Sequence, residues 1–278
     1  MTKQTPATTA PATSTAPDPK GARIAKVLAR AGVASRRESE KIIAAGRVAV
    51  NGTTITTPAI NVVDGDKITV DGTPLPVADV PRLWLFHKPT GVVTTTSDEK
   101  GRETIFDILP DGLPRVMSVG RLDLNSEGLL LLTNDGELKR TLELPSTGWM
   151  RRYRVRVNGR PTAERFAPLE QGLTVDGEHF KPMEVRLDRQ QRANAWLTIG
   201  IREGKNREIR RAMQAIGLSV NRLIRVSYGP FQLRELKSGA VEEVKQRVLK
   251  EQMGWSNKPK LSPRSKPRPR GKSTKPKT

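Results

Sequence analysis

The 278-residue sequence predicts an α+β protein made of a small first domain and a larger second domain. Two short helical patterns precede a strand hairpin near the N-terminus, whereas strands and isolated helices mix without regular alternation from Leu83 onward. Few large apolar side chains occur near either end of the chain. These observations predict domains at 22–80 and 81–250, between tails at 1–21 and 251–278.

Both tails are predicted to be disordered. Residues 1–20 are mainly Thr, Ala and Pro, which cannot bury enough apolar surface to offset the entropy lost on ordering. The segment from Lys258 to the end contains nine Lys or Arg, five Pro and no acidic residue. Its composition is compatible with a solvated extension and with a tether for RNA phosphates.

The small domain is predicted to begin with two helices. Residues 23–32 repeat apolar side chains at helical spacing, and Gly32 ends the pattern. The second helix begins with Ser35 as N-cap, has Glu38 three positions later as in a capping box, and ends at Gly46.

A short sheet is predicted to complete this domain. Val48 and Val50 alternate with polar or small neighbours before Asn51-Gly52, which is a strong hairpin turn. The segment DGDKITVDG at 64–72 supplies a further strand between two turns. The domain therefore consists of two helices and a short sheet.

The larger domain alternates buried and exposed positions in several segments. Strands are predicted for LWLFHKP at 83–89, GVVTTT at 91–96, the leucines at 129–132, RYRVRVNG at 152–159 and AWLTIGI at 195–201. A short helix is expected from Glu137, after the turn at 134–136. A second helix is expected at 206–217, with Asn206 as possible N-cap and Gly217 as its end.

The charge balance indicates a polyanionic partner. The chain has 49 Lys and Arg against 29 Asp and Glu, a formal net charge of +20. Such an excess favours nucleic acid, with an anionic membrane surface as the main rival. Several of these cations crowd the small domain, namely Arg23, Lys26, Arg30, Arg36, Arg37, Lys41 and Arg47. Because few acids accompany them, a phosphate-binding face is favoured over a merely solvated one.

Several chemistries are excluded by composition. The absence of cysteine rules out disulfides, thiolate zinc sites and cysteine nucleophiles, and two histidines are too few for a His-rich metal centre. The segment DLNSEG at 123–128 mimics the start of a calcium loop, but Asn134 occupies the position where a bidentate Glu is needed. Phosphate-loop and dinucleotide motifs are absent, so neither a metal nor a cofactor is predicted.

The chain is expected to be cytoplasmic. No run approaches the roughly 18 apolar residues of a membrane helix. The N-terminal segment has no continuous apolar stretch typical of a secretory signal. A two-carboxylate glycosidase is compatible with the composition, although the basic charge argues against it.

Asp123 is the candidate reactive group. It lies close to Arg121 and just ahead of the leucines at 129–132. A turn-capping role is the ordinary interpretation, yet a carboxylate beside a buried strand requires a cation or hydrogen bonds. The segment EGKNREIRR at 203–211 is rich in such cations. A carboxylate kept ionised in a basic cleft can act as nucleophile or base on RNA.

Two parts of the sequence resemble known families. The stretch RIAKVLARAGVASRRESEKIIAAGRVAVNG, within residues 22–77, resembles the RNA-binding module first known from small-subunit ribosomal protein S-four. Four blocks, GRLDLNSEGLLLLTNDGEL, RRYRVRV, EGKNREIRRAMQAIG and RLIRVSYGPF, resemble in order and spacing the pseudouridine synthases of the RsuA/RluB type. The RluB branch, which acts on large-subunit (23S) rRNA, is the most similar.

This resemblance implies a fold and a set of site residues. It implies a catalytic domain with a mixed, mainly antiparallel sheet, preceded by an S-four-like domain. Asp123 matches the essential aspartate, Tyr153 the tyrosine that stacks on the target base, and Arg210 the basic residue that pairs with the aspartate. Ile209 and Leu223 are expected to line the pocket. The residues expected to contact RNA are Arg121, Lys205, Asn206 and Arg207, with Arg23, Arg36, Arg37, Lys41 and Arg47 in the small domain.

The implied activity is isomerisation of uridine to pseudouridine in ribosomal RNA, after the target base is flipped out. Overall the reaction exchanges neither atoms nor electrons with solvent, so no cofactor is required. Nucleophilic attack on the ribose and formation of a glycal both remain open for the carboxylate. The expected partner is ribosomal RNA or a ribosomal-subunit precursor, and the protein is expected to be a monomer that binds no membrane. The alternative is a non-catalytic rRNA-binding assembly factor.

Overall fold

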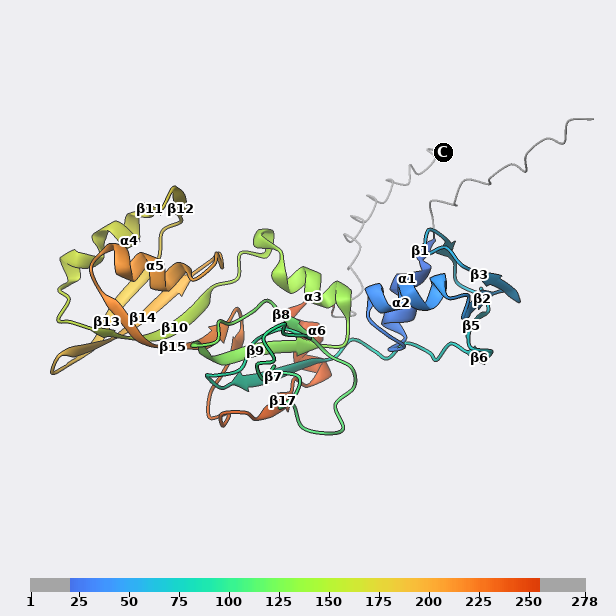
Figure 1. The fold of residues 1–278 in the computed structure, drawn as a ribbon. Helices are drawn as coiled ribbons and strands as arrows, with labels where there is room; N and C mark the ends of the chain where they lie inside the picture. Colours follow the sequence, from blue (N-terminus) through green and yellow to red (C-terminus); the bar gives the residue numbers. More distant parts are fainter. Residues whose placement is uncertain (1–20, 256–278) are drawn as a thin grey trace, which may run out of the picture.

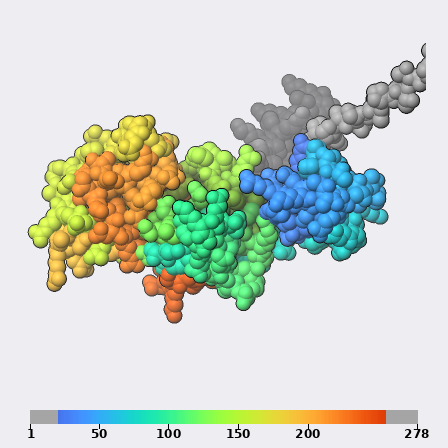
Figure 2. All heavy atoms as spheres, in the orientation of Figure 1, coloured from blue at the N-terminus to red at the C-terminus, as the bar shows by residue number. Residues whose placement is uncertain are grey.

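The computed structural model describes residues 21–255, so the predictions for 1–20 and for the basic segment from Lys258 lie outside the described residues. The described chain forms an elongated molecule with the small domain, here called the N-terminal module, at one end (Figure 1). Figure 2 shows this module as a separate lobe that adjoins the larger domain. Within residues 21–255 no helix has the length and apolar character needed to cross a membrane.

The N-terminal module has the predicted helices and sheet. Its elements are β1 (Ala22–Arg23), α1 (Ile24–Arg30), α2 (Arg36–Ala44), β2 (Val48–Val50), β3 (Thr53–Ile55), β4 (Asn61–Val62), β5 (Ile68–Val70) and β6 (Thr73–Pro74). The sheet has the order β3-β2-β5-β6 and is antiparallel, while β1 pairs separately with β4. Ile24, Leu28 and Ile43 are buried between the two helices and this sheet. The two-helix and short-sheet prediction is confirmed.

Local signals in the module act as the sequence indicates. The Ser35 hydroxyl accepts the Glu38 N–H at 3.1 Å, which satisfies one free donor at the start of α2. The Glu38 carboxylate pairs with Lys41 at 3.0 Å, so only one half of the capping box forms. Asn51 and Gly52 have φ angles of 52° and 82°, the left-handed pair that a two-residue hairpin needs.

A single mixed sheet organises the larger domain. Its strands, in the order β13-β14-β10-β15-β9-β7-β17, are β13 (Glu184–Gln191), β14 (Asn194–Ile201), β10 (Arg151–Asn158), β15 (Ser219–Tyr228), β9 (Glu127–Thr133), β7 (Leu83–Lys88) and β17 (Val241–Glu243). β16 (Phe231–Gln232) pairs with β15, and β8 (Met117–Val119) pairs with β9. All pairs are antiparallel except β9 with β15, which confirms the mixed, mainly antiparallel prediction.

Different elements cover the sheet in its two halves. The helices are α3 (Gly136–Glu143), α4 (Ala167–Gln171), α5 (Glu208–Ala215) and α6 (Gln246–Gln252), with 3-10 turns at Pro145–Thr147 and Ala163–Phe166 and a small hairpin of β11 (Leu173–Val175) and β12 (Glu178–Phe180). Helices α4 and α5 lie over one face of β10, β13 and β14 (Figure 1), with buried residues of β10, β14 and α5 in one apolar cluster. Helices α3 and α6 pack on the other face, against β7 and β9. The strands β7 and β9 are therefore buried on both faces, because alternate residues such as Phe86 and Leu130 belong to the same apolar cluster as β10 and β14.

Three details differ from the predicted boundaries. The segment GVVTTT contains no strand, only an isolated bridge between Val93 and Thr104, and its Thr94 hydroxyl bonds to the Leu122 carbonyl. The last helix, α6, runs past residue 250, where the catalytic domain was predicted to end. Asn206 is not the N-cap of α5, since Arg207 with φ 49° precedes the helix and the Glu208 carboxylate accepts the Lys205 N–H at 3.0 Å.

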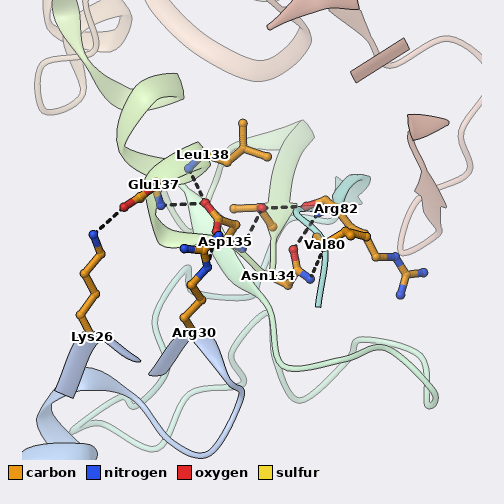
Figure 3. Close-up of polar contacts among 9 residues, drawn as sticks. Lys26, Arg30, Val80, Arg82, Asn134, Asp135, Glu137 and Leu138 are labelled. Carbon is orange, nitrogen blue, oxygen red and sulfur yellow. Dashed lines mark hydrogen bonds and ion pairs between the residues drawn. The ribbon is translucent and has the colours of Figure 1, made fainter. Parts of the chain in front are cut away.

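The predicted turn at 134–136 is also the junction with the N-terminal module (Figure 3). Asp135 caps α3 by accepting two backbone N–H groups, from Glu137 at 2.9 Å and from Leu138 at 2.7 Å. From α1 of the module, Lys26 reaches Glu137 at 2.5 Å and Arg30 reaches Asp135 at 3.8 Å. The α3 start therefore serves both as a capped helix end and as an ionic contact with the module.

The two halves of the large sheet meet at Gly128. There β9 runs parallel to β15 through only two register pairs, Ile224 with Glu127 and Arg225 with Gly128. Gly128 has φ +102°, and a Cβ on it would lie 2.3 Å from the Arg225 carbonyl oxygen. Glycine is required here because both the backbone conformation and the close approach exclude a side chain.

We expect Gly128→Ala to lower the free energy of unfolding by roughly 2–4 kcal/mol, since it adds a backbone clash to left-handed strain. Gly112→Ala is the matched control, because Gly112 has φ +87° but open space around it. Urea unfolding of both variants separates the two contributions. Equal losses for the two variants would show that the close approach to Arg225 contributes nothing.

Candidate active site

A cavity of about 650 Å³ opens where the two halves of the sheet meet. It is bordered by the loop before β9, by β10 and β15, and by the start of α5. Its lining includes Arg121, Asp123, Tyr153, Lys205, Arg207, Glu208, Ile209, Leu223 and Arg225. The cavity thus collects most of the predicted catalytic and pocket residues, which are separated by up to a hundred positions in the sequence. Of the site residues predicted in the larger domain, Asn206 and Arg210 are absent from its lining.

The loop 120–126, which carries Asp123, is held at several points. The Thr94 hydroxyl donates to the Leu122 carbonyl at 2.9 Å and accepts the Leu122 N–H at 3.3 Å. Farther along, the Gly91 N–H donates to the Leu124 carbonyl at 2.9 Å. Because its neighbours on both sides are bonded, Asp123 has little freedom to move with the loop.

Lys88 supports the same loop from below. It is fully buried at the end of β7, and its ammonium donates to the carbonyl oxygens of Pro89, Asp123 and Ser126 at 2.9, 3.2 and 2.9 Å. Burial lowers the pKa of Lys88 to about 8. Lys88 was not among the predicted site residues, although it continues the alternation of buried side chains from Trp84 and Phe86 along this strand.

Asp123 faces the guanidinium of Arg207 rather than that of Arg210. Arg207 Nη1 lies 3.9 Å from Asp123 Oδ2. Arg210 instead donates to the Val220 carbonyl at 3.0 Å and to the Asn125 carbonyl at 2.7 Å, and burial lowers its pKa. The expected Arg210–Asp123 ion pair is therefore not formed. Because α5 begins at Glu208, Arg210 faces β15 and the 120–126 loop, whereas Arg207, just outside the helix, faces the carboxylate.

Tyr153 and Arg225 come from neighbouring strands. They are register partners on β10 and β15, and both are almost completely buried. Arg225 Nε donates to the Leu129 carbonyl at 2.6 Å, while its buried Nη2 has no hydrogen-bond partner within the described residues. Arg225 was not predicted either, although it lies two positions after Leu223 and therefore on the same side of the strand, facing the cavity. The Arg225 guanidinium also lies 5.3 Å from the centre of the Tyr228 ring, another residue of the cavity lining.

The remaining predicted cavity residues form its walls and rim. Ile209 and Leu223 are buried and supply apolar surface, while Arg121 is exposed at the rim. The Lys205 ammonium donates to the His179 carbonyl and lies 3.6 Å from the Glu203 carboxylate. Its charge is thus partly neutralised by the protein itself.

Comparison with known proteins identifies the domains that carry these features. Residues 82–215 match the family described as RNA pseudouridylate synthase, and residues 22–68 match the S4 domain. The chain is 46% identical over 227 residues to an uncharacterized RNA pseudouridine synthase of Rickettsia felis, covering 82% of this chain and 98% of the relative. This chain belongs to the RNA pseudouridine synthase family.

Two further relatives have a more specific name. The chain is 40% identical over 238 residues to ribosomal large subunit pseudouridine synthase B of Haemophilus influenzae. This alignment covers 83% of this chain and 67% of the relative. The corresponding protein of Pseudomonas aeruginosa is 42% identical over 246 residues, with 85% and 64% covered. The fold is similar to a crystal structure of a pseudouridylate synthase, with a TM-score of 0.59, 24% identity, and 82% and 98% of the two chains covered.

The cations predicted to bind RNA in the S4 module lie outside this cavity. Arg47 pairs with Asp71 through bonds of 2.9 and 2.5 Å, and Arg23 donates to the Ala59 carbonyl at 2.5 Å. Arg36 and Arg37 are exposed, and neither forms an ion pair with another described residue. Lys41 on the same helix pairs with Glu38, so Arg36 and Arg37 at the start of α2 are the cations of this helix that form no ion pair with a described residue.

Glu208 is an acid buried in the wall of the synthase cavity. It is 3% exposed, and burial together with the nearby Glu203 carboxylate raises its pKa to about 7. Its Oε2 accepts the Lys205 N–H, so the side chain closes the loop at 203–208. Near neutral pH this carboxyl group is therefore partly protonated while it holds the segment that carries Arg207.

We expect Lys88→Met to lower the free energy of unfolding by roughly 2–4 kcal/mol, because three buried carbonyl oxygens lose their donor. Turnover should fall at least about tenfold, because Asp123 loses support and small displacements of reacting groups are costly. Urea unfolding and single-turnover kinetics measure the two effects, with exposed Lys100→Met as the control. Full activity of a folded Lys88→Met protein would contradict a positioning role.

Glu208 makes stability depend on pH. Its pKa is about 7 in the folded protein against 4.5 ordinarily, so the folded state binds more protons between these values. Its stabilising contribution is therefore complete below pH 4.5 and is lost as the pH rises through 7. Between pH 4.5 and 8, we expect the free energy of unfolding of wild type to fall by roughly 3 kcal/mol relative to that of Glu208→Gln. Urea unfolding at a series of pH values measures this difference. Parallel pH curves for the two proteins would disprove this assignment.

Proposed function

We propose that this enzyme isomerises a specific uridine of large-subunit ribosomal RNA to pseudouridine, with Asp123 as the reactive carboxylate. The observation that carries the proposal is Asp123 itself: it projects from a loop fixed by Lys88 and Thr94 into a cavity that also contains Tyr153. The choice of large-subunit RNA is supported by the names of the relatives from Haemophilus influenzae and Pseudomonas aeruginosa. The attached S4 module supports binding to structured RNA.

The cavity residues suit the steps of this isomerisation. The target uridine leaves its stack and enters the cavity, where Tyr153, Ile209 and Leu223 offer a flat and apolar boundary for the base. The Asp123 carboxylate then attacks the anomeric carbon or removes a ribose proton, and the bond from uracil N1 to the ribose breaks. Uracil turns and C5 bonds to the same ribose carbon, while either the Asp123–ribose bond breaks or Asp123 returns the ribose proton that it removed. C5 then releases its proton and N1 gains one, so Asp123 is regenerated as a carboxylate.

The cations of the cavity have separate tasks in this proposal. Arg207, 3.9 Å from Asp123, faces the carboxylate and orients it before reaction. Arg225 supplies its unpaired Nη2 as a donor inside the cavity for the carboxylate or for a uracil carbonyl. Arg210 acts indirectly, because it joins α5 to the loop of Asp123 through the Asn125 carbonyl. Arg121 and Lys205, at the rim, are assigned to the RNA backbone.

A non-catalytic assembly factor is the second candidate for this fold. It explains the basic module, but it gives no reason for a rigidly held carboxylate, a buried tyrosine and an unpaired guanidinium in one cavity. The enzyme is proposed to act as a monomer. We place the enzyme in the cytoplasm, with ribosomal RNA or a subunit precursor as partner.

We expect Asp123→Asn to abolish pseudouridine formation while leaving RNA affinity within about threefold, because the change removes one charge and little volume. The measurement is reverse-transcription mapping of carbodiimide-treated large-subunit RNA after incubation with each protein. Asp111→Asn, at an exposed position away from the cavity, is the matched control and should retain full activity. Pseudouridine formation by Asp123→Asn at the wild-type rate would refute Asp123 as the reactive carboxylate. No pseudouridine formation by wild type would refute the proposed enzyme.

A further inference from the structure

One face of the synthase sheet carries arginines and is left uncovered by helices among the described residues. On β10, Tyr153, Val155 and Val157 point to the cavity and the cluster under α4 and α5. The alternate residues Arg152 and Arg154 are exposed on the opposite face. Figure 1 shows α4 and α5 on one side of β10, β13 and β14 and no helix on the other.

The strand register gathers further arginines on this face. Arg156 pairs with Trp196 of β14, which in turn pairs with Arg189 of β13, so the three lie in one row. Arg154 lies in the adjacent row, across from Thr198. The surface, called here the arginine face, comprises Arg152, Arg154, Arg156, Arg186, Arg189, Trp196 and Arg222.

Carboxylates neutralise only half of these cations. Arg152 pairs with Glu184 at 3.3 Å, Arg186 with Asp188 at 3.0 Å, and Arg222 with Glu127 at 2.5 Å. These three ion pairs use the carboxylates that the strand register brings to this face.

The three remaining arginines surround Trp196. Arg154, Arg156 and Arg189 form no ion pair with any described residue. The Arg154 guanidinium lies 4.9 Å from the centre of the Trp196 ring, and the buried Nε of Arg156 has no acceptor. Like charges placed this close repel one another, and a donor without an acceptor costs free energy. An anionic partner that binds here would remove both costs.

The chemistry of this face fits the sugar-phosphate backbone of RNA. Guanidinium groups bind phosphate oxygens through two parallel hydrogen bonds, and a guanidinium held over a tryptophan offers a plane on which a base can stack. An anionic membrane would favour apolar side chains around the cations, whereas the half-buried neighbours on this face include the polar residues Asn194 and Thr198. The enzyme already handles RNA on the other side of the same sheet, and β13 is the edge around which an RNA can pass.

We propose that the arginine face is a second RNA-binding surface, which holds the phosphate backbone of a segment outside the one that enters the cavity. The proposal rests on the proposed function, since the bound segment belongs to the same RNA substrate. Arg154, Arg156 and Arg189 supply the phosphate contacts, and Trp196 keeps Arg154 in position. The face then contributes to affinity for long RNA and not to the chemical step.

The test compares two charge reversals of equal size. Arg154→Glu/Arg189→Glu alters the arginine face, and Arg247→Glu/Lys250→Glu alters exposed positions of α6. The dissociation constant is measured by filter binding for a long large-subunit RNA fragment and for a minimal stem-loop that contains the modified uridine. We expect the first variant to weaken binding of the long fragment at least about tenfold and to reduce the slope of log K against log salt by about 2. Stem-loop binding and single-turnover rate should stay within about twofold of wild type.

Other results would overturn the inference. Equal weakening by both double variants would show an effect of net charge alone, and unchanged binding of the long fragment would show that the face is only solvated. The double variant Arg154→Ala/Arg189→Ala, which introduces no carboxylate, should also weaken binding of the long fragment. Its circular dichroism spectrum should match that of wild type. Because binding is measured without turnover, the failure of this proposal is distinguishable from the absence of pseudouridine, which would instead refute the proposed function.

Discussion

The contact between Gly128 and the backbone of Arg225 is the constraint on which the synthase domain depends. It is the parallel junction between two antiparallel halves of the sheet, and it allows no side chain at residue 128. The loop of Asp123 ends just before it on β9. On β15, Arg225 is the register partner of Tyr153. One close backbone approach thus brings three cavity residues from three strands or loops to the same place.

The structure then limits the motion of the reactive carboxylate. Lys88 and Thr94 hold the Asp123 loop from below, and Arg210 ties it to α5 through Asn125. These contacts are made to backbone carbonyls, so the Asp123 side chain itself stays free for Arg207 and for a substrate. Preorganisation of this kind places the cost of ordering the site in folding rather than in the reaction.

The positive charge of the chain is divided among surfaces with different geometry. The module presents cations on α2, the cavity rim presents Arg121 and Arg207, and the arginine face lies on the reverse of the sheet. The module is tied to the synthase domain by Lys26 and Arg30, two cations that bind carboxylates at the start of α3. Because these contacts are ionic and largely exposed, their strength falls as salt rises.

The sequence by itself determined many of the local elements of this protein. A capped helix, an Asn-Gly hairpin and an alternating strand each depend on interactions between residues that are close in the sequence. Ser35, Asn51-Gly52 and the Tyr153–Val157 alternation were therefore interpreted correctly, and Asp123 was selected because a carboxylate beside a buried strand requires a partner. The identity of that partner depended on tertiary structure. Arg207 faces Asp123 because α5 begins one residue later, at Glu208. Lys88 and Arg225 bond to backbone carbonyls of the Asp123 loop and of β9 because they are buried near the ends of β7 and β15. Such contacts join residues far apart in sequence, so only the folded sheet brings them within bonding distance.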